Sequence, residues 1–270
     1  MISKNKIKYI RSLELKKNRN KEGKFVAEGF KVVDDLLALQ PADLIVATQE
    51  WLHGKHLADQ TEVIEVTEEE LKKVSFLQHP QQVLAVFRQD TGCNKQDSNN
   101  SQEEAEEKNF GFSKINTQEL SLALDGVQDP GNLGTIIRIA DWFGIRNVIC
   151  SEDTADVYNP KVVQATMGSI AHVDVTNLNL CEYVDALPPS TSVYGTLLDG
   201  EDIYQQTLTA TGIIIMGNEG KGISKDLRAR VNHPLLIPNF STLPNKAESL
   251  NVAIATAIAC SEFKRRTITT

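Results

Sequence analysis

The sequence predicts an α/β protein made of two domains, and three observations support this fold class. Apolar segments of strand length alternate with helical patterns along most of the chain, which is typical of sheets covered by helices. A polar, acidic stretch at residues 89–114 has the composition of a linker. The length of 270 residues suits one large or two modest domains. We therefore expect one domain at residues 1–88 and a second at 115–270.

The first domain is predicted to be a small α/β unit that opens with a basic helix. The apolar residues of that helix are Ile7, Ile10, Leu13 and Leu15. The helix should end near the turn-like stretch NRNKEGK, residues 18–24. Strands are predicted at 25–27, 44–48, 63–66 and 83–88, and helices at 30–37 and 67–74. Thr67, with Glu70 three residues later, has the pattern of a capping box that begins a helix.

The second domain alternates more regularly between strands and helices. Strands are predicted at 121–127, 147–150, 171–175, 192–199, 212–218 and 234–239. Helices are predicted at 133–144, 160–169, 179–187, 225–231 and 248–266. Because most of these strands are apolar along their length, we expect a parallel sheet with helices over both faces. Ligands of such sheets bind beyond the carboxyl ends of the strands, so the loops that follow the strands are the candidate site.

Charge is distributed unevenly along the chain. The net charge is −8, yet residues 1–31 hold ten Lys/Arg and three Glu, which gives +7 there and leaves −15 for the rest. Such asymmetry is a hint of nucleic-acid contact, although a solvated basic helix would show it too. Apolar runs are too short for a membrane span, and the N-terminus lacks the apolar core of a secretory signal. We therefore expect a cytoplasmic protein that does not bind a membrane.

Cysteines and histidines are not arranged as metal ligands. Cys93, Cys150, Cys181 and Cys260 are scattered without a C-x-x-C pair, so neither a metal framework nor disulfides are expected. His53 and His56 form H-x-x-H in a loop-like stretch without a suitably spaced Cys or acidic partner. The prediction is therefore no metal.

The first candidate loop is DGVQDPGNLGTIIR, residues 125–138. It resembles a nucleotide-binding turn but has neither G-x-G-x-x-G nor a closing Gly-Lys-Ser/Thr. We expect Asn132 to cap the following helix and Gly134 to allow a close backbone approach. Arg138 falls among apolar helical residues, so it is expected to be buried and to need an anionic partner. That partner is either an internal carboxylate or the phosphate or ribose of a ligand.

Two further loops follow later strands. MGNEGKGIS, residues 216–224, has three glycines that expose backbone donors and acceptors to a planar ring or an anion, and it carries Glu219. LIPNFS, residues 236–241, precedes ESLNV, where the last helix is expected to open. Ser249 and Asn251 are polar where that apolar helix begins, so they are either helix caps or ligand contacts. A plain glycine turn would likewise explain the second loop.

Taken together, the three loops resemble the motifs of a known family. N-L-G-x-x-x-R, M-G-N-E-G-x-G, I-P-x and E-S-L-N-V-A resemble, in order and spacing, the motifs of the SpoU (TrmH-type) RNA ribose methyltransferases, which belong to the knotted SPOUT superfamily. This resemblance covers residues 120–265. KKNRNKEGKFVAEGFKVVDDLL resembles the start of the L30e-like substrate-binding domain that precedes many such enzymes. One stretch departs from the pattern, since NFSTLPNKA at 239–247 is longer than the family's glycine-containing turn.

The resemblance implies a fold, a cofactor and a set of residue roles. The fold is an α/β SPOUT domain with a parallel sheet and a deep C-terminal trefoil knot, preceded by the small L30e-like α/β domain. The cofactor is S-adenosyl-L-methionine, held largely through backbone atoms of Gly217, Ile237 and Leu250. The reaction is methyl transfer to a ribose 2′-hydroxyl in RNA without a metal. Arg138 would activate the hydroxyl, as a base or as an electrostatic stabiliser. The residues that would position the arginine and the ribose are Asn132, Glu219, Ser249 and Asn251.

The resemblance also bears on partners and on rival functions. The L30e-like domain favours ribosomal RNA over tRNA as substrate, by analogy. Family members work as dimers with the site near the interface, and the apolar last helix fits either a dimer contact or an internal core position. The alternatives are a tRNA 2′-O-methyltransferase, a non-catalytic RNA-binding paralogue, and a dinucleotide-dependent enzyme on an α/β sheet. The missing dinucleotide fingerprint argues against the last of these.

Overall fold

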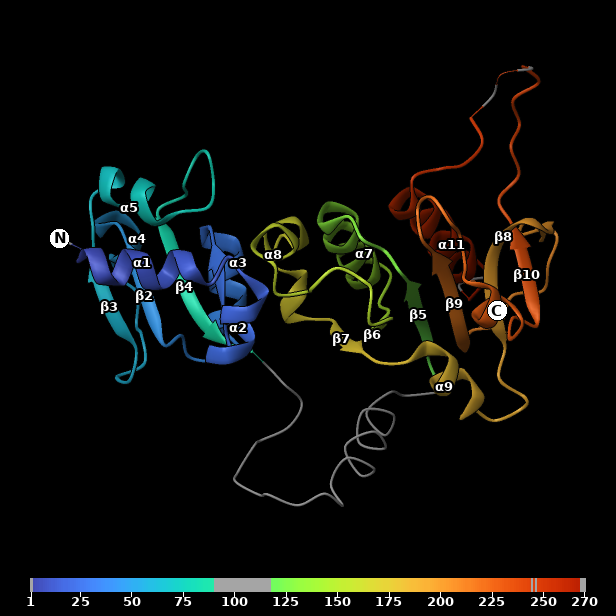
Figure 1. Ribbon diagram of the computed structural model, residues 1–270, viewed down its shortest axis with the longest axis horizontal. Helices are drawn as coiled ribbons and strands as arrows, with labels where there is room; N and C mark the ends of the chain where they lie inside the picture. The colour runs from blue at the N-terminus through green and yellow to red at the C-terminus, as the bar shows by residue number, and fades with distance from the viewer. Residues whose placement is uncertain (1, 90–117, 244, 246, 268–270) are drawn as a thin grey trace. The chain divides into compact units, whose positions relative to one another are not determined.

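The computed structural model in Figure 1 describes residues 2–89, 118–243, 245 and 247–267. Its residues group into two compact units. The first unit is Met1–Gln96 with Asp156–Ala171, and the second is Asp97–Ala155 with His172–Thr270. The sequence did not predict that residues 156–171 group with the first unit. The expected linker at 89–114 lies outside the described residues apart from Gln89.

The first unit contains a mixed four-stranded sheet. Its order is β1 (Lys24–Glu28), β4 (Val83–Arg88), β2 (Leu44–Ala47) and β3 (Glu62–Glu65). Strand β4 runs antiparallel to both β1 and β2, whereas β2 and β3 are parallel. All four strands were predicted. Successive residues of a strand point to opposite faces, and both faces are buried, with Phe25 in one apolar cluster and Val26 in another.

Helices cover both faces of this sheet. They are α1 (Lys4–Ser12), α2 (Lys16–Glu22), α3 (Phe30–Leu37), α4 (Gln49–Leu52) and α5 (Glu68–Val74). The capping box at the start of α5 is confirmed, because the Thr67 hydroxyl accepts from the Glu70 N–H and the Glu70 carboxylate accepts from the Thr67 N–H. Helix α4 was not predicted. No helix in the described part of the chain combines the length and the apolar character needed to cross a membrane.

The prediction of a turn at NRNKEGK was wrong, because most of this stretch forms α2. The helix ends at Gly23, whose φ of 62° is the left-handed geometry that favours glycine. Arg19 of α2 is buried and donates to the carbonyls of Leu13 and Glu14 at 2.9 and 2.6 Å. It also pairs with the carboxylate of Asp156. A polar residue therefore holds this helix in place, which a reading of apolar periodicity could not reveal.

The second unit contains a six-stranded parallel sheet, as predicted. Its order is β10 (His233–Leu236), β8 (Val193–Asp202), β9 (Gly212–Gly217), β5 (Leu120–Asp125), β6 (Asn147–Cys150) and β7 (Asp174–Asn177). Strands β6 and β7 follow β5 on one side, and β9 lies on its other side. The strand order therefore reverses between β5 and β9, and the carboxyl ends of these two strands form the crevice where ligands of open sheets bind.

Helices lie over both faces of the parallel sheet (Figure 1). One face packs against α9 (Leu180–Asp185) and α10 (Lys225–Arg228), and α7 (Pro130–Trp142) contacts α11 (Val252–Thr267). Helix α8 (Pro160–Thr166) and the 3₁₀ turn η1 (Ser169–Ala171) belong to the first unit. Several predicted boundaries were wrong, and two of them serve as examples. Strand β7 begins at Asp174 because η1 precedes it, and α11 begins at Val252 and not at residue 248.

Candidate active site

The three predicted loops are joined by a short chain of side-chain hydrogen bonds. The amide nitrogen of Asn132 donates to Oε1 of Glu219 at 3.0 Å. The amide nitrogen of Asn251 donates to Oδ1 of Asn132 at 2.9 Å. In the sequence, Glu219 lies 87 positions after Asn132, and Asn251 lies 119 positions after it. The fold therefore brings together one residue from each of the three motifs, with Asn132 in the middle.

Asn251 is both a helix cap and a member of this cluster. Its Oδ1 accepts from the backbone N–H groups of Ala253 at 2.9 Å and Ile254 at 3.3 Å, at the start of α11. Because the oxygen is committed to the helix, the amide nitrogen must point the other way, where it meets Asn132. Asn251 can therefore cap the helix and belong to the cluster at once, because the capping bonds fix the direction of its amide nitrogen.

Asn132 does not cap α7, contrary to the prediction. The cap is Asp129, whose carboxylate accepts from the Asn132 N–H at 2.8 Å, and Pro130 occupies the first turn. Proline suits that position because it has no N–H to leave unsatisfied. With the capping role taken by Asp129, the side chain of Asn132 is free to bond Glu219 and Asn251.

Arg138 is exposed, so the prediction that it is buried was wrong. Its neighbours Ile136 and Ile137 face the core. Arg138 instead shares an outer face of α7 with Thr135 and Trp142, at helical spacings of three and four residues. Within the described parts of the chain, Arg138 makes neither a hydrogen bond nor an ion pair. All of its donors are therefore available to an anion from outside the chain.

The glycine loop that carries Glu219 is held by Asn218, which the sequence reading missed. The Asn218 side-chain oxygen accepts from the N–H groups of Gly220 at 2.9 Å and Lys221 at 3.0 Å. Its amide nitrogen donates to the carbonyl of Gly126, in the first motif, at 2.6 Å. An asparagine side chain that hydrogen-bonds to the backbone two residues later is common in turns. The asparagine within this glycine-rich stretch was therefore the sequence feature that could have identified the role of Asn218.

Glycine is required in this loop for close approach. A Cβ on Gly217 would lie 2.3 Å from the carbonyl carbon of Gly222, so the two backbones can touch only without a side chain there. A second missed residue, Asp125, ends β5 and accepts from the Ser224 N–H at 2.6 Å. The sequence feature that could have identified Asp125 is an aspartate at the end of an otherwise apolar strand. Asp125 and Asn218 thus tie the first motif to the second.

The remaining predicted residues are not bonded to this cluster. Gly217 and Ile237 are half-buried at the ends of β9 and β10. Ser249 is exposed, and half of the Leu250 surface is accessible. Among the described residues, no hydrogen bond links the side chain of Ser249 to Asn132, Glu219 or Asn251. At the two ends of the stretch 239–247, which departs from the family pattern, the Asn239 amide donates to the Ala247 carbonyl at 2.9 Å.

The thiols of the second unit are poorly suited to act as nucleophiles. Burial raises the pKa of Cys150 to about 12 and that of Cys260 to about 12. A thiol with such a pKa is protonated at neutral pH, whereas the thiolate is the reactive form. Burial also raises the pKa of Cys181. Cys150 and Cys260 are therefore unlike the low-pKa thiols that act as nucleophiles. Within the described ranges, no three His, Cys, Asp or Glu residues gather as metal ligands.

Comparisons with known proteins agree with this arrangement. The SpoU rRNA Methylase family model matches residues 119–261, and the model of the MRM3-like substrate binding domain matches residues 4–85. The 23S rRNA (guanosine(2553)-2′-O)-methyltransferase RlmP of Bacillus subtilis is 33% identical over 257 residues, which cover 94% of this chain and 93% of the relative.

Two solved structures are similar over nearly the whole chain. A protein of the TrmH family from Porphyromonas gingivalis is 39% identical, with a TM-score of 0.84 and coverage of 98% of this chain and 99% of the other. The AdoMet-bound rRNA methyltransferase from Sinorhizobium meliloti is 30% identical, with a TM-score of 0.80 and coverage of 98% and 96%. The chain belongs to the SpoU rRNA methylase family and carries an MRM3-like substrate-binding domain before the catalytic one.

Proposed function

We propose that the protein transfers a methyl group from S-adenosylmethionine to the 2′-hydroxyl of a guanosine in 23S ribosomal RNA. The observation that carries the proposal is the Asn132–Glu219–Asn251 hydrogen-bond chain, which joins the three family motifs where the strand order reverses. The 23S rRNA relatives and the matched substrate-binding domain support the choice of RNA.

When bound, S-adenosylmethionine would supply a methyl group on a positively charged sulfur for transfer to the ribose 2′-oxygen, and the hydroxyl proton would pass to solvent or to a nearby acceptor such as the Glu219 carboxylate. We assign Glu219 to accept a hydrogen bond from that hydroxyl, and the bond from Asn132 to one of its carboxylate oxygens supports this role. Its other oxygen has no hydrogen bond to any described residue.

Arg138 supplies the electrostatic part of the mechanism. A guanidinium stays protonated in proteins, so we assign it to stabilising charge and not to removing the proton. Its planar fork fits the phosphate next to the reacting ribose. The exposed position of Arg138, without a carboxylate partner among the described residues, leaves it free for this contact.

The residues present fit the cofactor. Gly220 and Gly222 carry no side chains and have room where a Cβ would lie, so this part of the loop backbone is accessible to a ligand. The half-buried Ile237 and the exposed Leu250 provide apolar surface for an adenine ring. Gly217, Ile237 and Leu250 would hold the cofactor largely through backbone atoms, with Ser249 beside them to position the ribose.

Three finer features complete the proposal. The chain beyond β10 forms the deep trefoil knot of the SPOUT superfamily. Residues 1–88 act as the RNA substrate-binding domain and 115–270 as the methyltransferase domain. The protein works as a homodimer. Family membership supports all three, and the exposed faces of α7 and α11 support the last.

A methyl-transfer assay tests the proposed function. Purified protein is incubated with radiolabelled S-adenosylmethionine and either 23S rRNA or tRNA, and the RNA is digested to nucleosides. The expected product is 2′-O-methylguanosine from 23S rRNA alone. Label on tRNA alone would instead identify a tRNA enzyme, and absence of label with intact RNA binding would identify a non-catalytic paralogue.

A further inference from the structure

The turn that follows β6, residues 151–155, is bonded to the start of the first motif. Ser151 is buried, and its N–H donates to the carbonyl of Leu124 in β5 at 2.9 Å. The hydroxyl of Thr154 donates to the same carbonyl at 3.1 Å. The hydroxyl oxygen of Ser151 accepts from the N–H of Gly126 at 2.8 Å. This β6 turn therefore fixes the point where β5 ends and the first motif begins.

Gly126 is held from two neighbouring loops. Its N–H donates to Ser151, and its carbonyl accepts from the side-chain amide of Asn218 at 2.6 Å. Its φ of 70° is the left-handed geometry that favours glycine, and a Cβ there would lie 3.0 Å from Oδ2 of Asp153. The conformation of Gly126 thus depends on one contact from the loop after β6 and one from the loop after β9.

The position of Gly126 bears on the cluster of Asn132, Glu219 and Asn251. Gly126 lies in the same loop as Asn132, and Asn218 directly precedes Glu219. The first and second motifs therefore meet at two points, one between Gly126 and Asn218 and one between Asn132 and Glu219. A displacement of Gly126 at the first point would move Asn218, and with it the Glu219 carboxylate at the second.

The Ser151 hydroxyl is oriented for its contact by Asp153. It donates to Oδ1 of Asp153 at 2.6 Å. A hydroxyl has one proton to donate, so the oxygen is left to act as an acceptor toward Gly126. Removing this oxygen would leave a buried N–H without an acceptor, which is costly. The backbone can relieve that cost only by turning the Gly126 N–H elsewhere, which would disturb the bond from Asn218.

We propose that Ser151 is a positioning residue for methyl transfer. Through Gly126 and Asn218 it sets how Glu219 and Asn132 face each other. Because Ser151 is buried, it acts through these residues and not on the substrate. The proposal rests on the proposed function and adds to it a residue that lies outside the three motifs. It assigns to the β6 turn an effect on the rate of methyl transfer and not on RNA affinity.

Single-turnover methyl transfer to 23S rRNA by the full-length chain, at saturating RNA and S-adenosylmethionine, tests this role. Ser151→Ala should lower the rate about 10–10²-fold, as expected when a reacting group is misplaced by about 1 Å, and should leave the Kd for RNA unchanged. Ser151→Cys keeps the shape of the side chain but replaces the oxygen with a weakly accepting sulfur, so its rate should also fall. Ser151→Thr retains the oxygen and should retain most of the rate.

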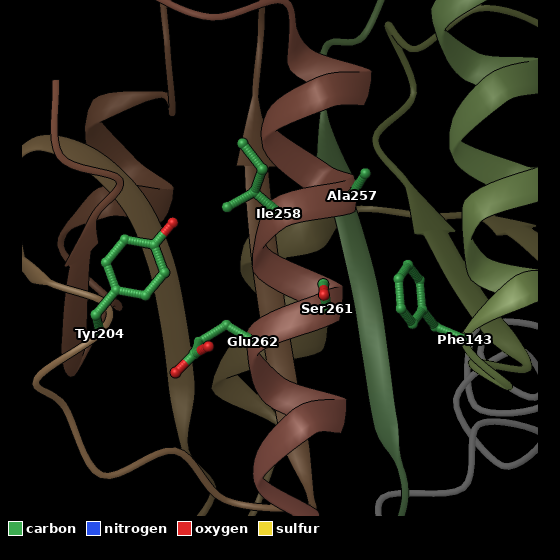
Figure 2. Close-up of a pocket in the computed structure, with 6 residues that line it drawn as sticks. All are labelled: Phe143, Tyr204, Ala257, Ile258, Ser261 and Glu262. Atoms are coloured by element: carbon green, nitrogen blue, oxygen red, sulfur yellow. The ribbon is translucent and has the colours of Figure 1, made fainter. Parts of the chain in front are cut away.

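Two other hydroxyls of the second unit provide controls. Thr256→Val removes a buried hydroxyl that donates to the Val252 carbonyl within α11 at 2.7 Å. Ser261→Ala removes the hydroxyl of a residue that lines a pocket of about 440 Å³ beside α11 (Figure 2). Within the described residues, neither hydroxyl is bonded to the three motifs or to the β6 turn. Both variants should therefore keep the wild-type rate.

Amide exchange at Gly126, followed by NMR, tests the contact independently of activity. It should be faster in Ser151→Ala than in the wild type, and unchanged in Thr256→Val. If Ser151→Ala does not fold, Ser151→Cys serves for both measurements.

Unchanged exchange at Gly126, or a wild-type rate in the folded Ser151 variants, overturns the positioning role and leaves the proposed function standing. An equal loss of rate in Thr256→Val overturns it as well, because any lost buried hydroxyl would then have the same effect. A wild-type protein that transfers no methyl group to RNA overturns the proposed function, and the role of Ser151 with it.

Discussion

Arg138 is the residue whose loss should separate chemistry from cofactor binding. It projects from the first motif, whereas the proposed cofactor contacts lie in the second and third. We expect Arg138→Ala to leave the Kd for S-adenosylmethionine nearly unchanged. The methyl-transfer rate should fall about 10²–10³-fold, as when one well-placed stabilising donor is removed. Arg138→Lys should not restore the rate, because a point charge does not replace a planar fork.

Arg146 provides a matched control for this prediction. It is another exposed arginine of the second unit, and Arg146→Ala should retain both cofactor affinity and rate. Calorimetry and single-turnover kinetics measure the two quantities separately. If Arg138→Ala lost cofactor binding in proportion to its activity, Arg138 would be a cofactor or structural residue.

Glu28 should give the first unit a characteristic pH dependence. Burial raises the pKa of Glu28 above its ordinary value of 4.5, although hydrogen bonds from Ser75 and the Phe76 N–H work against the shift. The folded protein therefore holds this proton more tightly than the unfolded chain. The resulting stability is fully present below pH 4.5 and is lost as the pH rises through the folded pKa.

Urea unfolding between pH 4 and 7 measures this effect. The free energy of unfolding of the wild type should fall relative to that of Glu28→Gln as the pH rises, because glutamine stays neutral throughout. Glu65→Gln, on the exposed side of β3, is the control and should show no such trend. A wild-type-minus-Glu28→Gln difference that stays flat across this range would contradict the prediction.

At the scale of elements, the alternation of strands and helices was predictable because apolar periodicity reports burial directly. The misassigned elements were set by polar contacts instead. Helix α2 depends on a buried arginine, and the start of α7 on which of two nearby polar residues caps it. Arg138 was predicted to be buried because its helix is apolar overall, whereas its position around the helix turns it outward.

The candidate site was only partly predictable for the same reason. Asn132, Glu219 and Asn251 were singled out, but their mutual hydrogen bonds depend on strand order, which places loops about a hundred residues apart side by side. Asn218 and Asp125 were missed because their roles are to hold backbone atoms of another loop. Such roles leave little mark on periodicity or on composition.

The cap of α7 gives a prediction at the element scale. Asp129→Ala removes the acceptor for the Asn132 N–H and should lower the free energy of unfolding by about 1 kcal/mol. Asp129→Asn should recover most of the loss, since asparagine caps equally well. Ser224→Ala is the matched control, because the Ser224 side chain makes no capping bond to α10. Guanidinium unfolding measures these changes. If Asp129→Ala and Ser224→Ala lowered the free energy of unfolding equally, the capping role of Asp129 would be contradicted.

At the scale of the whole molecule, the first unit is not a simple N-terminal attachment. Val163, from the segment between β6 and β7, is buried in its core, and Arg19 pairs with Asp156 of the same segment. A fragment that begins at residue 115 would keep Val163 and Asp156 but would lack the apolar core and the arginine that they contact. Experiments on RNA binding and cofactor binding are therefore best done with the full chain.

The basic start of the chain should contribute phosphate contacts to RNA binding. Lys16 and Lys17 on α2 are exposed. Replacing both with alanine should flatten the plot of log affinity against log salt by about 0.7–0.9 for each RNA phosphate that is no longer neutralised. The same change at Lys72 and Lys73, exposed on the acidic helix α5, should leave the slope unaltered. Filter binding of 23S rRNA over a salt series measures the slopes, and equal slopes for both pairs would place the RNA surface elsewhere.

Mapping of 2′-O-methylation in 23S rRNA from cells that lack this gene tests the proposed function most directly. We predict that one guanosine loses its 2′-O-methyl group. The wild-type gene should restore the modification, and the Arg138→Ala gene should not, although its protein accumulates and binds S-adenosylmethionine. An unchanged 23S methylation pattern in the deletion, or full restoration by Arg138→Ala, would contradict this assignment of function and site.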